Sequence, residues 1–115
     1  MKPQTRNPQT GESDHSDVTP TTLFAALAAR RRQRTLRYLS QKPAAIHIGD
    51  LAEYIAITED EPSHDRYQRI LVDLYHTHLP HLSTAGLVSY DETTELVSLT
   101  VDRDVIEPYL RLLTD

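Results

Sequence analysis

The chain has 115 residues, with 12 basic and 17 acidic side chains and a formal net charge of −5. Leucine, isoleucine, valine and phenylalanine together number 28, which is enough to form the core of one domain. The absence of cysteine excludes a disulfide scaffold, a thiolate zinc site and a cysteine nucleophile, and no apolar run approaches the roughly 20 residues needed to span a membrane.

Residues 1–20 are polar and include three prolines, and they contain no apolar run typical of a secretory signal. They offer too little apolar surface to offset the entropy lost on ordering, so we expect a disordered tail followed by one domain over residues 21–115. Thr19 and Pro20 are typical of a helix start. We expect a cytoplasmic protein without a membrane partner.

Charge is distributed unevenly along the chain. Residues 21–42 carry six basic side chains and no acid, whereas residues 43–115 carry fourteen acids and only four arginines. Ten of the 12 basic residues are arginine. An acidic chain with almost no lysine is typical of a high-salt cytoplasm, where hydrated carboxylates keep proteins soluble. An ordinary acidic protein is the alternative.

Two helices are predicted before the first strand. At 100° per residue, Leu23 and Leu27 share a face that Leu36 and Leu39 do not, so we expect a break at residues 28–31 and a second helix that ends at residues 41–43. Residues 45–48 form a β-prone run. Asp50 then predicts a helix cap, with a capping box completed by Glu53.

That third helix is expected to end at Thr58, and residues 58–65 are expected to form an acidic loop. A long apolar stripe predicts a helix over residues 66–85 that Pro80 kinks without ending, and Gly86 is its expected stop. The residues of the stripe are Tyr67, Ile70, Leu71, Leu74, Tyr75, His78, Leu82 and Ala85.

The last third of the chain predicts a β-hairpin and a final helix. Residues 87–90 and 96–101 read as strands joined by a turn over residues 91–95. Asp104 is the expected cap of the final helix, in which Pro108 lies early enough to be tolerated. The predicted fold class is mainly α with a small β-hairpin wing, which is a winged helix-turn-helix.

The segment from Leu74 to Asp91 reads LYHTHLPHLSTAGLVSYD and resembles a winged-helix family found in small proteins of halophilic archaea. In that family the signature LYHTHLPKLxxAGVVxYD follows a helix with the pattern RRRxxLxYL. The matching residues here are the arginines at 30–32, Leu36, Tyr38 and Leu39, and the resemblance covers residues 22–100. It implies a winged-helix fold and, by analogy of fold, a role in transcription regulation, although the family is a domain of unknown function.

Candidate DNA contacts fall on two helices. The basic block over residues 30–42 predicts contacts with DNA phosphates, and the alternative is a solvated face that forms ion pairs with the acidic remainder. The predicted reading helix presents a polar face with a nearly neutral charge, for which simple solvation is the alternative. The residues predicted to contact DNA are Arg30, Arg31, Arg32, Arg34, Arg66, Arg69, His76 and Thr77.

Two features oppose conventional docking on DNA. The predicted wing tip carries Asp91, Glu92 and Glu95, which phosphates repel. The long acidic loop before the reading helix would also hold that helix loosely, because a turn of three or four residues is usual there.

Three histidines lie close together in sequence but are not predicted to bind a metal. On a helix, His76 projects away from His78 and His81, and four converging ligands are needed for a structural zinc site. We expect His78 to pack in the core and to donate to a backbone carbonyl, and His76 to be exposed. The chain has no phosphate-binding loop and no nucleophile motif, so we expect neither a cofactor nor an enzyme.

The final helix predicts either a homodimer interface or packing against the chain's own first helix. Its apolar stripe consists of Val105, Ile106, Tyr109 and Leu113. The leading hypothesis is therefore a dimeric winged-helix regulator that binds double-stranded DNA. The alternative is a winged helix used for protein interaction or dimerisation without direct DNA binding.

Overall fold

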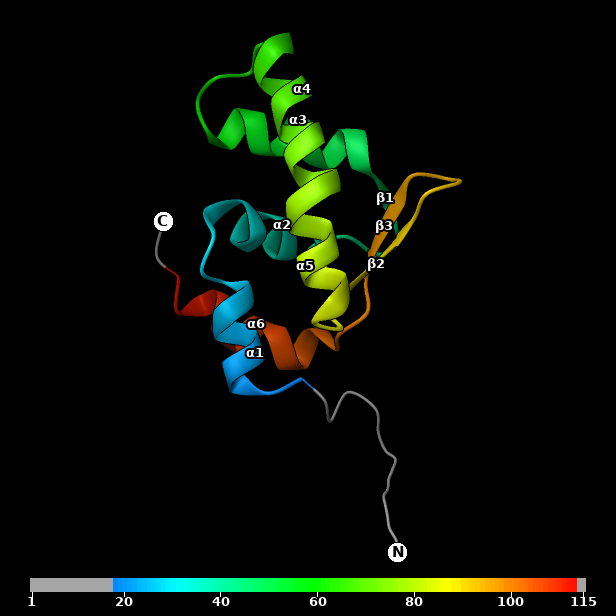
Figure 1. The fold of residues 1–115 in the computed structure, drawn as a ribbon. Coiled ribbons are helices and arrows are strands. Elements are labelled where there is room, and N and C mark those ends of the chain that lie inside the picture. The colour runs from blue at the N-terminus through cyan, green and yellow to red at the C-terminus, as the bar shows by residue number, and fades with distance from the viewer. Residues whose placement is uncertain (1–17, 114–115) are drawn as a thin grey trace, which may run out of the picture.

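The computed structural model describes residues 18–113, so the predicted tail, apart from residues 18–20, lies outside the described part of the chain. This part is mainly helical and has one three-stranded antiparallel sheet (Figure 1). In chain order its elements are α1 (Pro20–Ala26), α2 (Arg30–Ser40), β1 (Ile46–His47), α3 (Ile48–Thr58), α4 (His64–Asp73), the π-helical turn η3 (Leu74–His78), α5 (Leu79–Thr84), β2 (Val88–Asp91), β3 (Leu96–Leu99) and α6 (Arg103–Arg111).

The predicted break between the first two helices is confirmed. The Thr19 hydroxyl accepts a hydrogen bond from the Thr22 backbone N–H, and Pro20 lies in the first turn of α1. After α1 ends, side chains of α2 reach back to it: Arg32 donates to the Ala26 carbonyl at 2.9 Å, and Gln33 donates to the Leu27 carbonyl at 2.7 Å. These bonds satisfy carbonyls that the end of a helix leaves without partners.

The predicted capping box at Asp50 is wrong. Helix α3 begins three residues earlier, because the His47 side chain caps it by accepting from the Gly49 N–H at 2.9 Å. Asp50 therefore lies in the first turn, where its charge favours the positive end of the helix. The helix ends at Thr58, as predicted.

The loop before α4 is shorter than predicted and covers residues 59–63. The Ser63 hydroxyl accepts from the Arg66 N–H at 3.1 Å and so starts α4 at His64. A side-chain cap of this kind fixes the start of a helix. The predicted loop of residues 58–65 is thus corrected to five residues.

Elements α4, η3 and α5 form one continuous helix that crosses the molecule (Figure 1). The π turn precedes Pro80, and the Leu79 N–H bonds to the Leu74 carbonyl five residues back. Such a turn accommodates a proline whose ring would meet a carbonyl in a regular α-helix. It also shifts the helix phase, so that Leu79 is buried and Tyr75 is exposed, although the periodicity predicted that Tyr75 would face the core.

The hairpin pairs β2 with β3, and β1 pairs with the other edge of β3, so the strand order is β1-β3-β2. Asp91 closes the turn by accepting from the Thr93 N–H at 2.9 Å. Gly86 ends α5 with φ at +80°, a conformation that favours glycine, as its predicted role requires.

Helix α6 begins at Arg103, so Asp104 lies in its first turn and is not its cap.

The inner face of α6 meets a core that all the main elements share. The largest fully buried side chains include Leu23, Leu36, Leu51, Ile55, Ile70, Leu74, Leu79, Leu82, Leu87, Val97 and Ile106. Among the described residues, no helix is long and apolar enough to cross a membrane.

Candidate nucleic-acid interface

One face of α4 and η3 points to solvent and carries polar side chains. Gln68, Val72 and His76 recur every four residues and therefore lie on the same side of the helix. Arg69 and Thr77 flank them, and these five residues, with Asp73, line a shallow groove of about 450 Å³. The sequence prediction missed Gln68 and Val72, although their spacing from His76 would have revealed them. We call Gln68, Arg69, Val72, His76 and Thr77 the α4 face.

Arg69 is the exposed cation of the α4 face. Its guanidinium lies 3.1 Å from Asp65, one turn earlier, and its side chain is 72% exposed. An exposed pair of this kind contributes less than about 1 kcal/mol, so Arg69 can exchange Asp65 for another partner. This residue fits the prediction of a DNA contact.

Arg66 belongs to a different surface from Arg69. It donates to Glu59 at 3.1 Å and to Glu61 at 2.6 Å, both in the loop that precedes α4. The hydrogen bond to Glu61 raises the pKa of Arg66. The structure thus separates Arg66 from the rest of the predicted reading face and gives it a role in anchoring the loop.

Arg31 is the centre of an ion-pair network behind α4. It forms a two-point contact with Glu59, with distances of 2.6 Å from Nε to Oε2 and 3.0 Å from Nη2 to Oε1. Its third contact is with Asp73, at 2.8 Å. Paired geometry of this kind gives the strongest hydrogen bonds that arginine makes. The contact joins α2, the end of α3 and α4.

Asp73 extends the network to His78 across the π turn. His78 Nε2 lies 2.8 Å from an Asp73 carboxylate oxygen, and its Nδ1 lies 3.2 Å from the Arg32 guanidinium. Because the guanidinium is only a donor, Nδ1 must accept and Nε2 must carry the proton. Burial lowers the pKa of His78 despite the opposing effect of Asp73. The imidazole is therefore neutral near pH 7, and the predicted bond to a backbone carbonyl is replaced by one to a carboxylate.

Most of the basic block on α2 is bound within the chain. Arg34 lies 3.9 Å from Glu59, and Arg37 donates to the carbonyls of Leu110 and Leu113 at the end of α6. Arg30 is exposed, whereas Arg31, Arg32 and Arg34 are half-buried. This arrangement corresponds to the alternative interpretation of the block, in which its charges pair with the acidic remainder.

The hairpin beside the α4 face is acidic. Glu92 accepts from the Tyr75 hydroxyl at 3.3 Å, and Glu95 lies 3.0 Å from His47. Between these acids the turn carries only Thr93 and Thr94. The hairpin tip therefore has no cationic side chain with which to contact a phosphate.

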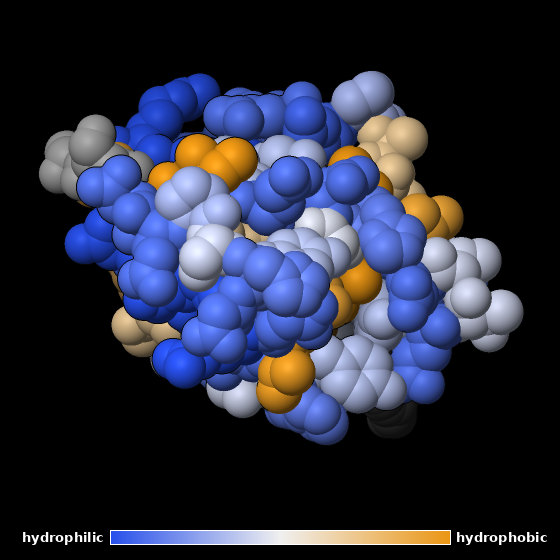
Figure 2. All heavy atoms as spheres, turned by 90° about the horizontal axis from the view of Figure 1, so that it is seen from above, coloured by the Kyte–Doolittle hydropathy of each residue, from blue (hydrophilic) through white to orange (hydrophobic). Residues whose placement is uncertain are grey.

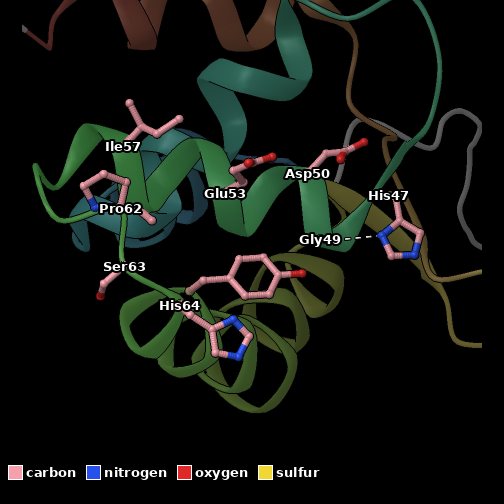
Figure 3. Close-up of a pocket in the computed structure, with 10 residues that line it drawn as sticks. His47, Gly49, Asp50, Glu53, Ile57, Pro62, Ser63 and His64 are labelled. Carbon is pink, nitrogen blue, oxygen red and sulfur yellow. Dashed lines mark hydrogen bonds between the residues drawn. The ribbon is translucent and has the colours of Figure 1, made fainter.

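A second groove, of about 460 Å³, lies between α3 and the start of α4 (Figure 3). Tyr67 lines this groove. A Cβ added at Gly49 would come within 2.9 Å of the Tyr67 hydroxyl, so a small residue fits there best. Seen from this end, the surface is mainly hydrophilic with small separate apolar groups (Figure 2).

The three neighbouring histidines do not converge. His78 is buried in the network, whereas His76 and His81 are exposed. Within residues 18–113, no group of three or more histidine, aspartate or glutamate side chains is arranged to hold a metal ion.

The stripe of α6 packs against the chain's own helices. Ile106 is fully buried in the core, and the Tyr109 ring meets the Phe24 ring edge-on with centroids 5.4 Å apart. Val105 and Leu113 are half-buried against the same core. Of the four residues predicted to form a dimer interface, Ile106 is therefore inaccessible to a second chain.

Comparison with known proteins identifies a family but no characterised relative. A family model described as "Domain of unknown function (DUF7344)" matches residues 24–98. The match extends from α1 into β3 and includes the whole α4 face. No curated protein and no solved structure matches the chain.

Proposed function

We propose that this chain, which belongs to the DUF7344 family, is a winged-helix protein that binds double-stranded DNA and regulates transcription. The order α2, β1, α3, α4 and hairpin, with β1 on the free edge of β3, supports a winged-helix architecture. In this architecture the continuous helix formed by α4 and η3 is the reading helix, and the hairpin is the wing.

The observation that carries the proposal is the exposed α4 face. Gln68 supplies the donor and acceptor that recognise adenine in the major groove, Arg69 supplies the two donors that recognise guanine, and Val72 supplies a methyl surface that suits thymine. His76 and Thr77 add polar groups one to two turns further along. The side chains of one helix face reach base edges when that helix enters the groove.

The remaining surface predicts few phosphate contacts. Most arginines of α2 are bound within the chain, and the hairpin tip is acidic. Each phosphate contact contributes about −0.9 to the slope of log affinity against log salt. We therefore propose that base contacts dominate the affinity for DNA. The slope of log affinity against log salt should then be shallower than about −3. Such a weak dependence on salt suits a protein of a high-salt cytoplasm, as in a halophilic archaeon.

Replacing Arg69 with alanine is expected to weaken DNA binding by about 5- to 150-fold, because one good base contact contributes about 1–3 kcal/mol. The measurement is fluorescence anisotropy on fragmented genomic DNA across a potassium chloride series. Arg111→Ala is the matched control, because Arg111 is equally exposed and also pairs with an acid one turn away, but lies on α6.

Unchanged affinity in Arg69→Ala would contradict the assignment of the α4 face. Absence of DNA binding at every salt concentration, from a protein whose circular dichroism shows it folded, would contradict the proposed function as a whole. Equal losses in Arg69→Ala and Arg111→Ala would show that the loss is not specific to the α4 face.

A second candidate function is protein interaction without direct DNA binding. The observation that favours it is the acidic hairpin, where Asp91, Glu92 and Glu95 lie beside the reading helix. Phosphates repel this surface, whereas a basic protein partner does not. DNA binding itself separates the two candidates, because only the first predicts saturable binding of double-stranded DNA by the folded protein.

We also propose that two copies pair through α1 and α6. Phe24 is 57% exposed and Leu112 is 70% exposed, and Tyr109 lies against Phe24. Residues 18–29 carry no charge, so here a second chain with the same net charge of −5 approaches without repulsion. Symmetric pairing would present two reading helices to a palindromic site.

Replacing Phe24 with serine is expected to abolish a concentration-dependent dimer in sedimentation velocity. Burial of exposed aromatic surface is the driving force, so sulfate should strengthen the dimer. Ile57→Ser is the matched control, because Ile57 is 59% exposed at the end of α3. A wild-type protein that stays monomeric at every concentration would refute this pairing.

A further inference from the structure

A third groove, of about 380 Å³, separates the long helix from the hairpin. Tyr75 of η3 and Tyr90 of β2 form its aromatic walls, with ring centroids 6.0 Å apart in an edge-on arrangement. Leu71 and Val72 of α4 continue the apolar surface. The groove thus exposes Tyr75 and Val72, whereas Tyr90 and Leu71 are partly buried against the core.

Two carboxylates lie at the rim of this groove. Glu92 is held toward it by the Tyr75 hydroxyl, and Glu95 is more than half exposed beside His47. No lysine or arginine of residues 18–113 lines the groove. Burial raises the pKa of the Tyr90 hydroxyl and the neighbouring glutamates add to that effect, as a negative local potential requires.

We propose that this groove binds a basic segment of a partner protein by taking up one of its arginine side chains. The aliphatic stem of an arginine lies along Val72 and the tyrosine rings, and its planar guanidinium meets Glu92 and Glu95. Arginine suits the site better than lysine because its guanidinium stacks on aromatic rings and contacts carboxylates through two donors.

Charge and shape exclude the other common occupants. A phosphate or nucleic-acid backbone is repelled by both glutamates, and a second copy of this chain brings more acid than base. A purely apolar segment would leave the carboxylates desolvated without a partner. The combination of aromatic walls and an acidic rim therefore selects a segment with arginine next to aliphatic residues.

A segment bound in this groove is expected to block DNA binding, and this step rests on the proposed function. Val72 and His76 line both this groove and the groove of the α4 face. A segment seated between helix and hairpin therefore covers part of the surface that would enter the major groove. Partner and DNA exclude each other, so the partner acts as an inhibitor of DNA binding.

The test uses a fluorescein-labelled peptide, Gly-Ser-Arg-Leu-Ala-Arg-Leu-Gly-Ser, and the same peptide with citrulline in place of both arginines. We expect saturable binding of the arginine peptide by anisotropy and at least tenfold weaker binding of the citrulline peptide, because citrulline keeps the shape and loses the charge.

The combined variant Glu92→Gln and Glu95→Gln should lose at least tenfold in affinity for the arginine peptide. Tyr75→Ala should lower the affinity for both peptides, because it removes one aromatic wall of the groove. Glu53→Gln, an exposed acid on α3 outside this groove, is the matched control and should bind like the wild type.

Equal binding of both peptides, or full binding by the double glutamine variant, would overturn the groove assignment. Because these glutamates are exposed on the hairpin, the variants should keep the wild-type circular dichroism spectrum and melting temperature. The last arm adds unlabelled arginine peptide to the protein bound to labelled DNA, and release of the DNA is expected. Simultaneous binding of the peptide and the DNA would overturn the proposed mutual exclusion and would leave the groove assignment standing. Absence of DNA binding would remove the proposed function, and the peptide arm would still decide the groove.

Discussion

Replacing Arg31 with leucine is expected to lower the free energy of unfolding by about 2–3 kcal/mol. The substitution removes the cation that both Glu59 and Asp73 contact, at 2.6 and 2.8 Å, and leaves two partly buried carboxylates without it. Loss of one partner from a fully buried ion pair costs about 3–5 kcal/mol. The expected value here is lower because water reaches part of the site and because Arg66 stays beside Glu59.

Arg30→Leu is the matched control for this measurement. Arg30 is the neighbouring residue on α2, is exposed and forms no ion pair among residues 18–113, so we expect a change within about 0.5 kcal/mol. Urea unfolding followed by circular dichroism at pH 7 gives both values. Equal losses in the two variants would show that the network adds nothing to stability and that only the change in surface charge matters.

The same network explains why the block of arginines on α2 presents little positive charge to a ligand. Glu59 alone receives contacts from Arg31, Arg34 and Arg66. Each guanidinium bound in this way contributes less to the external potential, since the nearby carboxylate offsets its charge. The cations of α2 and of the start of α4 therefore hold α4 against α2 and the end of α3, and the proposed recognition of DNA depends on the α4 face.

Local patterns in the sequence predicted most of the elements. The two helix faces of residues 23–39 revealed the break before α2, and Gly86 marked the end of α5. Patterns of this kind depend on residues within one or two turns of each other. The cap of α3 was missed because a histidine took the role, which the usual cap preferences do not favour.

The candidate site was harder to predict because its decisive contacts are distant in sequence. Arg31 meets Glu59 and Asp73 across 28 and 42 positions, and no periodicity links those residues. The π turn added a second difficulty, because one widened turn changes the phase of every later residue relative to a regular helix. Tyr75, which lies within that turn, was assigned to the stripe that faces the core, and with it the aromatic groove was missed.

Stability is expected to fall as the pH drops below about 6.5, the ordinary pKa of histidine, because the fold lowers the pKa of His78. The unfolded chain takes up a proton there while the folded chain does not, so acid favours unfolding by at most about 1.4 kcal/mol per pH unit for this one proton. Protonation of Nδ1 would also place a second donor against the Arg32 guanidinium, 3.2 Å away.

A second and steeper loss should follow at lower pH. The hydrogen bond with Arg31 lowers the pKa of Glu59, and Arg31 and His78 together lower the pKa of Asp73 against the effect of burial. Both carboxylates therefore contribute stability that is present above their ordinary pKa values of 4.5 and 3.8 and is lost as the pH falls through their lowered values. The two losses occur in different pH ranges, because the first begins near the ordinary pKa of a histidine and the second near the ordinary pKa of a carboxylate.

Urea unfolding between pH 3 and pH 8 measures both losses, and two histidine variants separate them. His78→Gln keeps an N–H that can reach Asp73 but cannot titrate, so its stability should be flat between about pH 5 and pH 7.5 and should fall only with the carboxylates. His76→Gln changes an exposed histidine of the same turn and should retain the wild-type profile. A wild-type profile that is flat through pH 6.5 would mean that the fold leaves the pKa of His78 unchanged. A profile that rises as the pH falls would mean that Asp73 outweighs burial and raises that pKa.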